Sequence, residues 1–88
     1  MNIGQAFGRA LKAKRAEMGI SQEQLADEAD MARSFLSKIE NGKIGITLTT
    51  VTKLSLALNC DPSIMLAHAE EIATRNAPDW RNQLKREL

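Results

Sequence analysis

The middle of the chain carries four polar side chains at helical spacing, Arg33, Ser34, Ser37 and Lys38. Residues three and four apart are neighbours on a helix, so a helix over this segment places all four on one face. The guanidinium of Arg33 presents a fork of donors that matches the N7 and O6 acceptors of guanine in the major groove. The serine hydroxyls donate or accept, and Lys38 has the length to reach guanine or a phosphate. Such a face has the chemistry to read base edges.

Polar side chains of these types on a helix face are most often solvated surface, so the face alone does not establish base contact. The position of this face in the chain favours base contact. The segment Ser21–Gly42 holds two short helical patterns separated by a tight break, with the small Ala26 where two helices would cross. A helix-turn-helix uses this arrangement to hold its second helix rigidly, so that it can enter the major groove of double-stranded DNA.

Capping signals predict where the first two helices begin and where the first one ends. Asn2 with Gln5, and Ser21 with Gln24, each form the pattern of a capping box. Gly19 supplies a left-handed stop after the first helix.

The third helix is expected over about residues 32–41, ended by Gly42. Thr47 is expected to cap a fourth helix. Asp61 followed by Pro62 opens a fifth, because proline at the first helical position loses no hydrogen bond.

Apolar residues at helical spacing define the expected core, and no segment shows the alternation of a strand. The positions expected to face inward are Ile3, Phe7, Ala10, Leu11, Met18, Leu25, Ala26, Ala29, Phe35, Leu36, Ile39, Leu48, Val51, Leu54, Leu58, Ile64, Met65, Leu66, Ala69 and Ile72.

The fold class is therefore expected to be all-α. A five-helix DNA-binding domain is expected over residues 1–74, with the helix-turn-helix at 21–42 and a short C-terminal helical tail at 75–88. In the tail, Trp80, Leu84 and Leu88 share one face, which packs either on the fifth helix or on a partner chain.

Composition limits the other classes of function. The 88 residues suit one small domain, and the net charge of +1 is too low for a nonspecific nucleic-acid coat. Cys60 is the only cysteine, and neither a signal peptide nor a membrane-spanning run is evident, so a cytoplasmic location without membrane attachment is expected. Cys60 and His68 lack partners at metal-ligand spacing, and no catalytic constellation or glycine-rich phosphate loop is present. We expect no enzyme, metal or cofactor.

The run SQEQLA, followed by a turn and then S-x-I-E-N-G, resembles the phage repressor and Cro-like family of helix-turn-helix regulators, also called the xenobiotic-response-element type. The resemblance covers about residues 7–67. It implies a five-helix domain whose third helix reads bases, with two copies bound to an inverted-repeat operator. The half-sites of such an operator lie about 34 Å apart on one face of the duplex.

The resemblance also implies roles for individual residues. Arg33 and Ser34 stand at positions the family uses for base contact. Gln22 matches a glutamine that clamps a phosphate and braces the first reading residue, and a helix start favours an anion there. The resemblance further implies that Asn41 and Lys43 contact phosphates of the DNA backbone. It also implies that Arg15 and Glu40 form a structural ion pair between the first helix and the end of the third.

Two positions depart from the family pattern. Asp30 occupies the turn position usually held by glycine, so it is expected to adopt a positive φ. Ala32 stands where relatives often carry a capping threonine or serine, so the third helix is expected to lack a side-chain cap.

Three functions fit these observations. The first is a homodimeric, sequence-specific transcriptional regulator, such as a phage repressor or a restriction–modification controller. The second is an antitoxin of the same fold that binds a toxin protein and regulates its own operon. The third is an interaction module without DNA binding, which the retention of Arg33, Gln22 and Lys38 disfavours.

Overall fold

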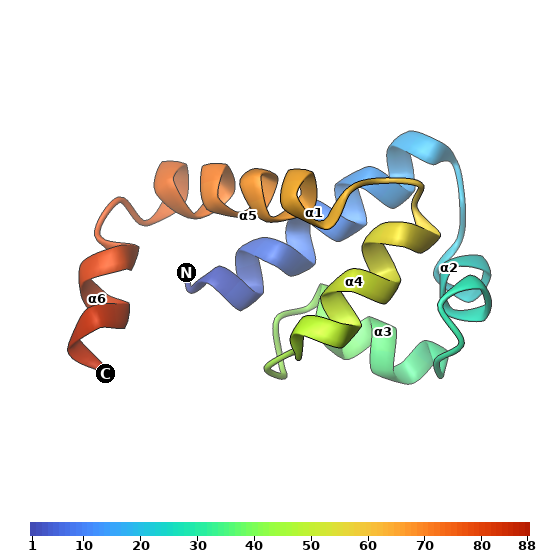
Figure 1. Ribbon diagram of the computed structural model, residues 1–88, viewed down its shortest axis with the longest axis horizontal. Helices are drawn as coiled ribbons and strands as arrows, with labels where there is room; N and C mark the ends of the chain where they lie inside the picture. Colours follow the sequence, from blue (N-terminus) through green and yellow to red (C-terminus); the bar gives the residue numbers. More distant parts are fainter.

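Six helices and no strands make up the computed structural model, which describes residues 1–88 (Figure 1). The expected all-α fold class is confirmed. The helices are α1 (Ile3–Met18), α2 (Gln22–Glu28), α3 (Arg33–Glu40), α4 (Leu48–Ala57), α5 (Pro62–Asn76) and α6 (Trp80–Arg86). None of them combines the length and apolar character needed to cross a bilayer.

The predicted capping boxes of α1 and α2 are confirmed. The Asn2 side chain accepts from the Gln5 backbone N–H at 2.8 Å, and the Gln5 side chain accepts from the Asn2 N–H at 2.9 Å. Ser21 and Gln24 repeat this exchange at 3.0 and 2.8 Å. Gly19 ends α1 with a left-handed φ of 69°. These bonds satisfy N–H groups that a helix start otherwise leaves without partners.

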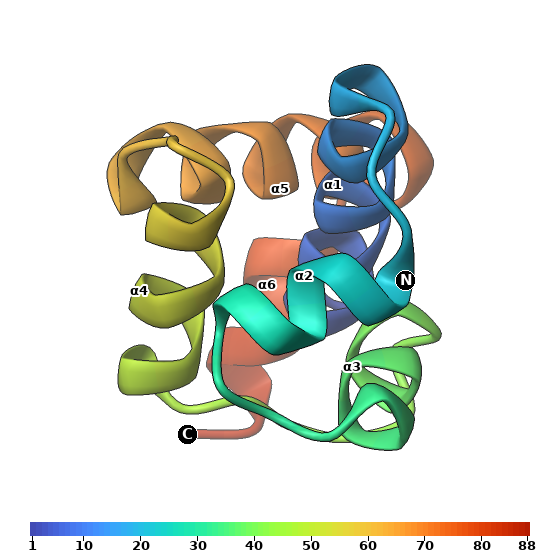
Figure 2. The same ribbon diagram turned by 90° about the vertical axis from the view of Figure 1, so that its right-hand side faces the viewer.

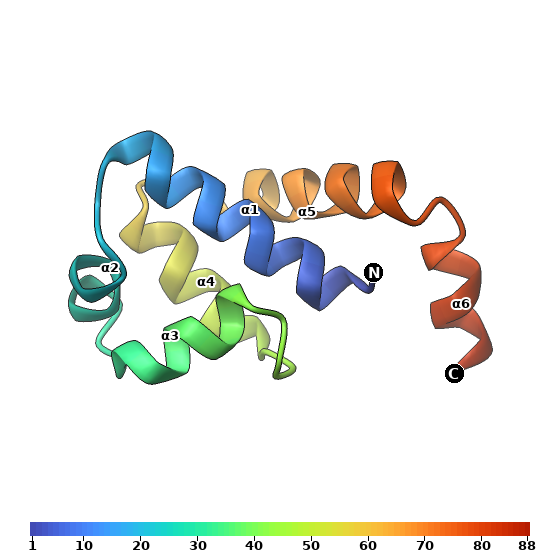
Figure 3. The same cartoon turned by 180° about the vertical axis from the view of Figure 1, so that it is seen from behind.

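The core forms where α1 lies against α5 and α3, with α2 and α4 closing its sides (Figures 1 and 3). Its sixteen residues are mostly alanine and leucine with one phenylalanine and one tryptophan: Ala6, Phe7, Ala10, Leu11, Leu25, Ala26, Ala29, Leu36, Ile39, Val51, Leu54, Leu58, Met65, Ala69, Ala73 and Trp80. The alanines allow the helices to approach closely.

The helix α1 approaches the end of α3 closely at Gly8. A Cβ atom added to Gly8 would lie 2.8 Å from the carbonyl oxygen of Glu40 and closer still to that of Ile39. Real Cβ atoms essentially never come this near to backbone. The position of α3 relative to α1 therefore depends on the missing side chain.

Four of the positions expected to be buried are exposed, so the sequence prediction was wrong for them. They are Met18 at 40%, Phe35 at 38%, Leu48 at 76% and Ile64 at 48% exposed. Met18 and Leu48 lie at the ends of their helices, beyond the reach of the core. Phe35 and Ile64 each lie one position away from the buried stripe of α3 and α5. In both cases the apolar pattern is wider than the surface that packs.

The tail was expected to pack either on the fifth helix or on a partner chain, and Trp80 packs on the fifth helix, α5. Its side chain is 9% exposed, and its indole N–H donates to Thr74 Oγ1 at 3.1 Å. The Arg81 guanidinium lies 4.6 Å from the centroid of the Trp80 ring. Leu84 and Leu88 are both exposed, with 43% and 101% of their surface accessible. Beyond Trp80, α6 stands off from the body of the molecule (Figure 1).

Candidate nucleic-acid interface

The turn between α2 and α3 takes the conformation that the sequence predicts. Asp30 has a positive φ of 53°, which permits the tight break between the two helices. The N–H of Met31 donates to the carbonyl of Ala26 at 2.9 Å and closes the end of α2. Ala32 caps α3 without a side-chain hydrogen bond, also as expected. Figure 2 shows α2 and α3 joined by this turn.

The helix α3 is divided into a buried and an accessible side. Leu36, Ile39 and Glu40 are buried. On the other side lie the four residues expected to contact bases: Arg33, Ser34 and Lys38 are exposed and Ser37 is half-buried. The structure therefore brings these four side chains to the surface of a helix whose inner side is fixed in the core.

A buried carboxylate lies behind this face. Glu40 is 6% exposed, and its two oxygens accept from Arg15 Nε at 2.9 Å and Nη2 at 3.1 Å. Arg15 Nη1 also donates to the carbonyl of Ile20 at 3.0 Å. The hydrogen bond with Glu40 raises the pKa of Arg15 above its ordinary value. The ion pair implied by the family resemblance is thus present, and it ties α1 to the end of α3.

Gln22 connects the buried pair to the accessible face. Its Nε2 donates to Glu40 Oε1 at 3.0 Å, and its Oε1 accepts from Arg33 Nε at 3.4 Å. A glutamine amide nitrogen has two donors, so one N–H of Gln22 remains for an anion such as a phosphate. A continuous chain of hydrogen bonds therefore runs from Arg15 in α1 to Arg33 on the surface.

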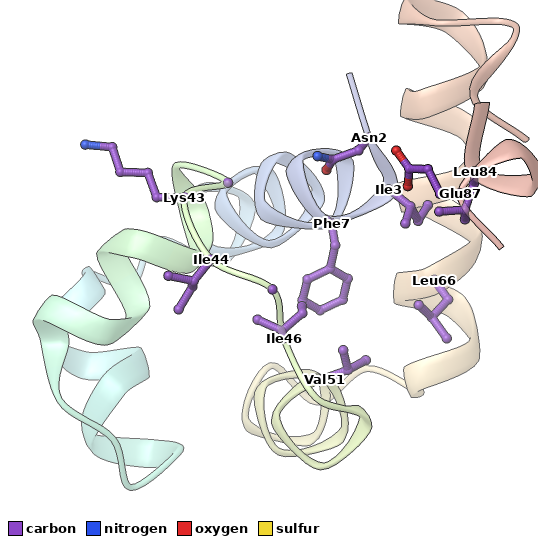
Figure 4. Close-up of a pocket in the computed structure, with 13 residues that line it drawn as sticks. Asn2, Ile3, Phe7, Lys43, Ile44, Ile46, Val51, Leu66, Leu84 and Glu87 are labelled. Atoms are coloured by element: carbon purple, nitrogen blue, oxygen red, sulfur yellow. The ribbon is translucent and has the colours of Figure 1, made fainter.

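Asn41 and Lys43 come directly after α3, and both are exposed. The amide of Asn41 donates to Ser37 Oγ at 3.5 Å, at the long limit of a hydrogen bond. In Figure 4 the Lys43 side chain points away from the body of the protein.

The basic side chains of this surface have no acidic partners. The four ion pairs of the structure join Lys14 to Glu17, Arg15 to Glu40, Arg81 to Glu70 and Arg86 to Asp79. Arg33, Lys38 and Lys43 take part in none of them. Three cations without acidic partners therefore lie on and just after α3, although the net charge of the chain is only +1.

Sequence reasoning missed the bond between Gln22 and Glu40. No local pattern signals it, because the two residues are 18 positions apart and meet only when α2 packs across α3.

The structure contains no cluster of three histidine, cysteine or acidic side chains positioned to hold a metal ion.

Comparisons with known proteins agree with this geometry. The Helix-turn-helix family matches residues 11–65. Control protein C.BamHI of Bacillus amyloliquefaciens is 36% identical over 66 residues, which cover 74% of this chain and 82% of the relative. The competence pilus inhibition repressor of Acinetobacter baylyi is 32% identical over 78 residues, covering 86% of this chain and 71% of the repressor.

A solved structure is also similar to this chain, in sequence and in fold. The restriction-modification controller protein C.AhdI from Aeromonas hydrophila superposes with a TM-score of 0.67 at 33% identity, over 69% of this chain and 92% of the controller. The chain belongs to the helix-turn-helix family of DNA-binding transcriptional regulators, of the phage repressor and Cro-like type.

Proposed function

We propose that the chain binds a specific double-stranded DNA sequence as a homodimer and reads an inverted-repeat operator with α3, the helix expected over residues 32–41 and observed over Arg33–Glu40. The observation that carries this proposal is the hydrogen-bonded chain from Arg15 through Glu40 and Gln22 to Arg33. A flexible arginine loses side-chain entropy when it binds, and a side chain that is already braced loses less. Arg33 is held at the surface in this way.

Base contacts are assigned to the accessible side of α3, and phosphate contacts to the residues around it. Arg33 reads guanine through two donors, Lys38 reaches guanine or a phosphate, and Ser34 and Ser37 add weaker hydrogen bonds. Gln22, Asn41 and Lys43 hold the backbone and so fix the register of α3 in the groove.

The biological role that we propose is a small transcriptional switch that regulates its own expression. Support comes from the relatives, which include a control protein and a repressor. In such a switch, the concentration of the dimer sets the occupancy of the operator.

The test is selection from a randomised duplex library with the purified chain at near-physiological salt. The expected result is an enriched inverted repeat with half-site centres about 34 Å apart, bound by two chains. A parallel selection with Arg33→Ala should lose preference at one position of each half-site. If the folded wild-type chain enriches no sequence, the proposal is wrong.

The second candidate is the antitoxin. The feature that favours it is the exposed apolar surface of α6, which that function would use for a toxin protein. A small protein that co-purifies with the chain in stoichiometric amount, and whose gene neighbours it, would distinguish an antitoxin from a simple regulator.

A further inference from the structure

An apolar groove of about 580 Å³ opens between α6 and the body of the protein (Figure 4). Ile3 and Phe7 of α1, Ile44 and Ile46 of the loop after α3, and Leu66 of α5 line it, and Leu84 of α6 closes one side. No side chain of the same chain fills this groove. Leu88 follows α6 on the side of the apolar stripe, and it is fully exposed, at 101%.

The accessible surface of the chain is also larger than a compact monomer requires. It measures 5526 Å², whereas a monomer of 9.7 kDa is expected to expose about 5,100 Å². The excess of about 400 Å² is roughly half of what each partner buries in a protein interface of standard size. A contact that covered this excess would be small, and it would form a weak dimer.

The shape of the molecule indicates what covers the groove. The Cα atoms extend 37 Å along the longest axis and 21 and 18 Å along the others. The half-site spacing of about 34 Å is larger than either short dimension, which favours a contact near an end of the long axis over a side-by-side contact. The two ends are formed by α2 and by α6 (Figure 1).

Charge distinguishes these two ends. The segment Gln22–Glu28 contains three acidic residues and no lysine or arginine, so two copies of the α2 end repel each other. The α6 end carries both signs, with Lys85 next to Arg86 and Glu87. A twofold interface places the same patch on both partners, and a patch with both signs can satisfy itself in that arrangement.

We propose that α6 is a dimerisation arm: each copy places its Leu84 and Leu88 against the apolar groove of a second copy, reciprocally. The groove is then filled, the apolar stripe is covered, and the two reading helices are linked through the loop that follows α3. This inference rests on the proposed binding of two copies to an inverted repeat.

Sedimentation equilibrium of the full chain, from about 1 to 200 μM, tests the arm in Leu84→Asp and Leu88→Asp variants. The Leu88 side chain is fully exposed in the monomer, so its substitution leaves the fold intact. Each change should raise the dimer dissociation constant at least tenfold. The matched control is Leu56→Asp, an exposed leucine of α4 that does not line the groove, and it should stay within twofold of the wild type.

Thermal unfolding, and the emission of the single tryptophan Trp80, show whether α6 is still docked in the Leu84→Asp variant. Equal dimerisation by all four proteins, or a loss confined to Leu56→Asp, would overturn the arm and leave DNA recognition standing. A wild-type chain that remains monomeric and binds a single half-site would overturn both the arm and the homodimer. A dimer that depends on Leu84 and Leu88 but enriches no DNA sequence would support the arm and overturn the proposed function.

Discussion

Gln22 and Glu40 are joined by a hydrogen bond of 3.0 Å, although 18 positions separate them in the sequence. The bond connects the first residue of α2 to the last residue of α3, and both side chains have further partners in Arg33 and Arg15. The relative position of the two helices is therefore fixed by polar contacts as well as by the apolar core. A substitution at the buried end of this network, at Arg15 or Glu40, should therefore alter how Arg33 is held at the accessible end.

Arg15→Ala should destabilise the fold by about 3 kcal/mol, because it leaves the buried carboxylate of Glu40 without its charged partner. Urea unfolding measures this loss. Glu17→Ala is the control on the same helix: it removes the exposed pair with Lys14, and should cost about 0.5 kcal/mol or less. Equal losses in the two variants would mean that Glu40 is not held by Arg15.

Gly8→Ala should destabilise the fold by about 1 to 3 kcal/mol, since the new Cβ collides with the backbone at the end of α3. Gly4→Ala is the matched control in the same helix. A Cβ there meets only Asn2 Oδ1 at 3.4 Å, an ordinary contact, and alanine favours helix over glycine by up to about 1 kcal/mol. Thermal melts should therefore move in opposite directions. A neutral Gly8→Ala would contradict the close crossing of α1 and α3.

Arg33→Ala should remove about 1 to 3 kcal/mol of discrimination at one base pair of each half-site, with little loss on random duplex. Competition binding against single-base variants of the selected site gives this value. An equal loss on specific and random DNA would contradict the assignment of Arg33 to base contact.

Lys43→Ala should instead weaken binding to every sequence alike, because a phosphate contact carries no base information. The slope of log affinity against log salt should fall by about one for each half-site contact that is lost. A Lys43→Ala variant with an unchanged salt slope and altered base preference would reverse its role with that of Arg33.

The carboxyl of Asp79 at the start of α6 should titrate below its ordinary pKa. Hydrogen bonds from Asn82 and then from Arg86 lower the pKa of Asp79 in the folded chain. Stability from these contacts is therefore complete at neutral pH, and it is lost as the pH falls through the lowered pKa. Carbon-detected NMR titration measures the value directly. An Asp79 that titrates at or above the ordinary pKa, about 3.9, would contradict the contacts.

Local chemistry made part of the fold predictable from sequence. The capping boxes, the left-handed Gly19 and the positive φ of Asp30 depend on residues within a few positions, so the sequence contains the whole signal. The polar side of α3 is predictable for the same reason, because helical periodicity separates Arg33 and Lys38 from Leu36.

The remaining features depend on how the helices meet. The close approach at Gly8 and the bond between Gln22 and Glu40 arise from helix crossings, which no local pattern specifies. Periodicity likewise placed Phe35 and Leu48 in the core, but the surface that packs against α3 and α4 is narrower than their apolar patterns.

The division of α3 into a buried and an accessible side separates two kinds of selection on one short helix. Substitutions at exposed positions outside the Gln22–Glu40 network, such as Ser34 and Lys38, change stability little, generally by less than about 0.5 kcal/mol. With α3 reading bases as proposed, single amino-acid changes on the outer side can alter operator preference while Leu36 and Ile39 keep the helix in place. Outside the chain of hydrogen bonds that ends at Arg33, the scaffold and the outer side of α3 can change almost independently.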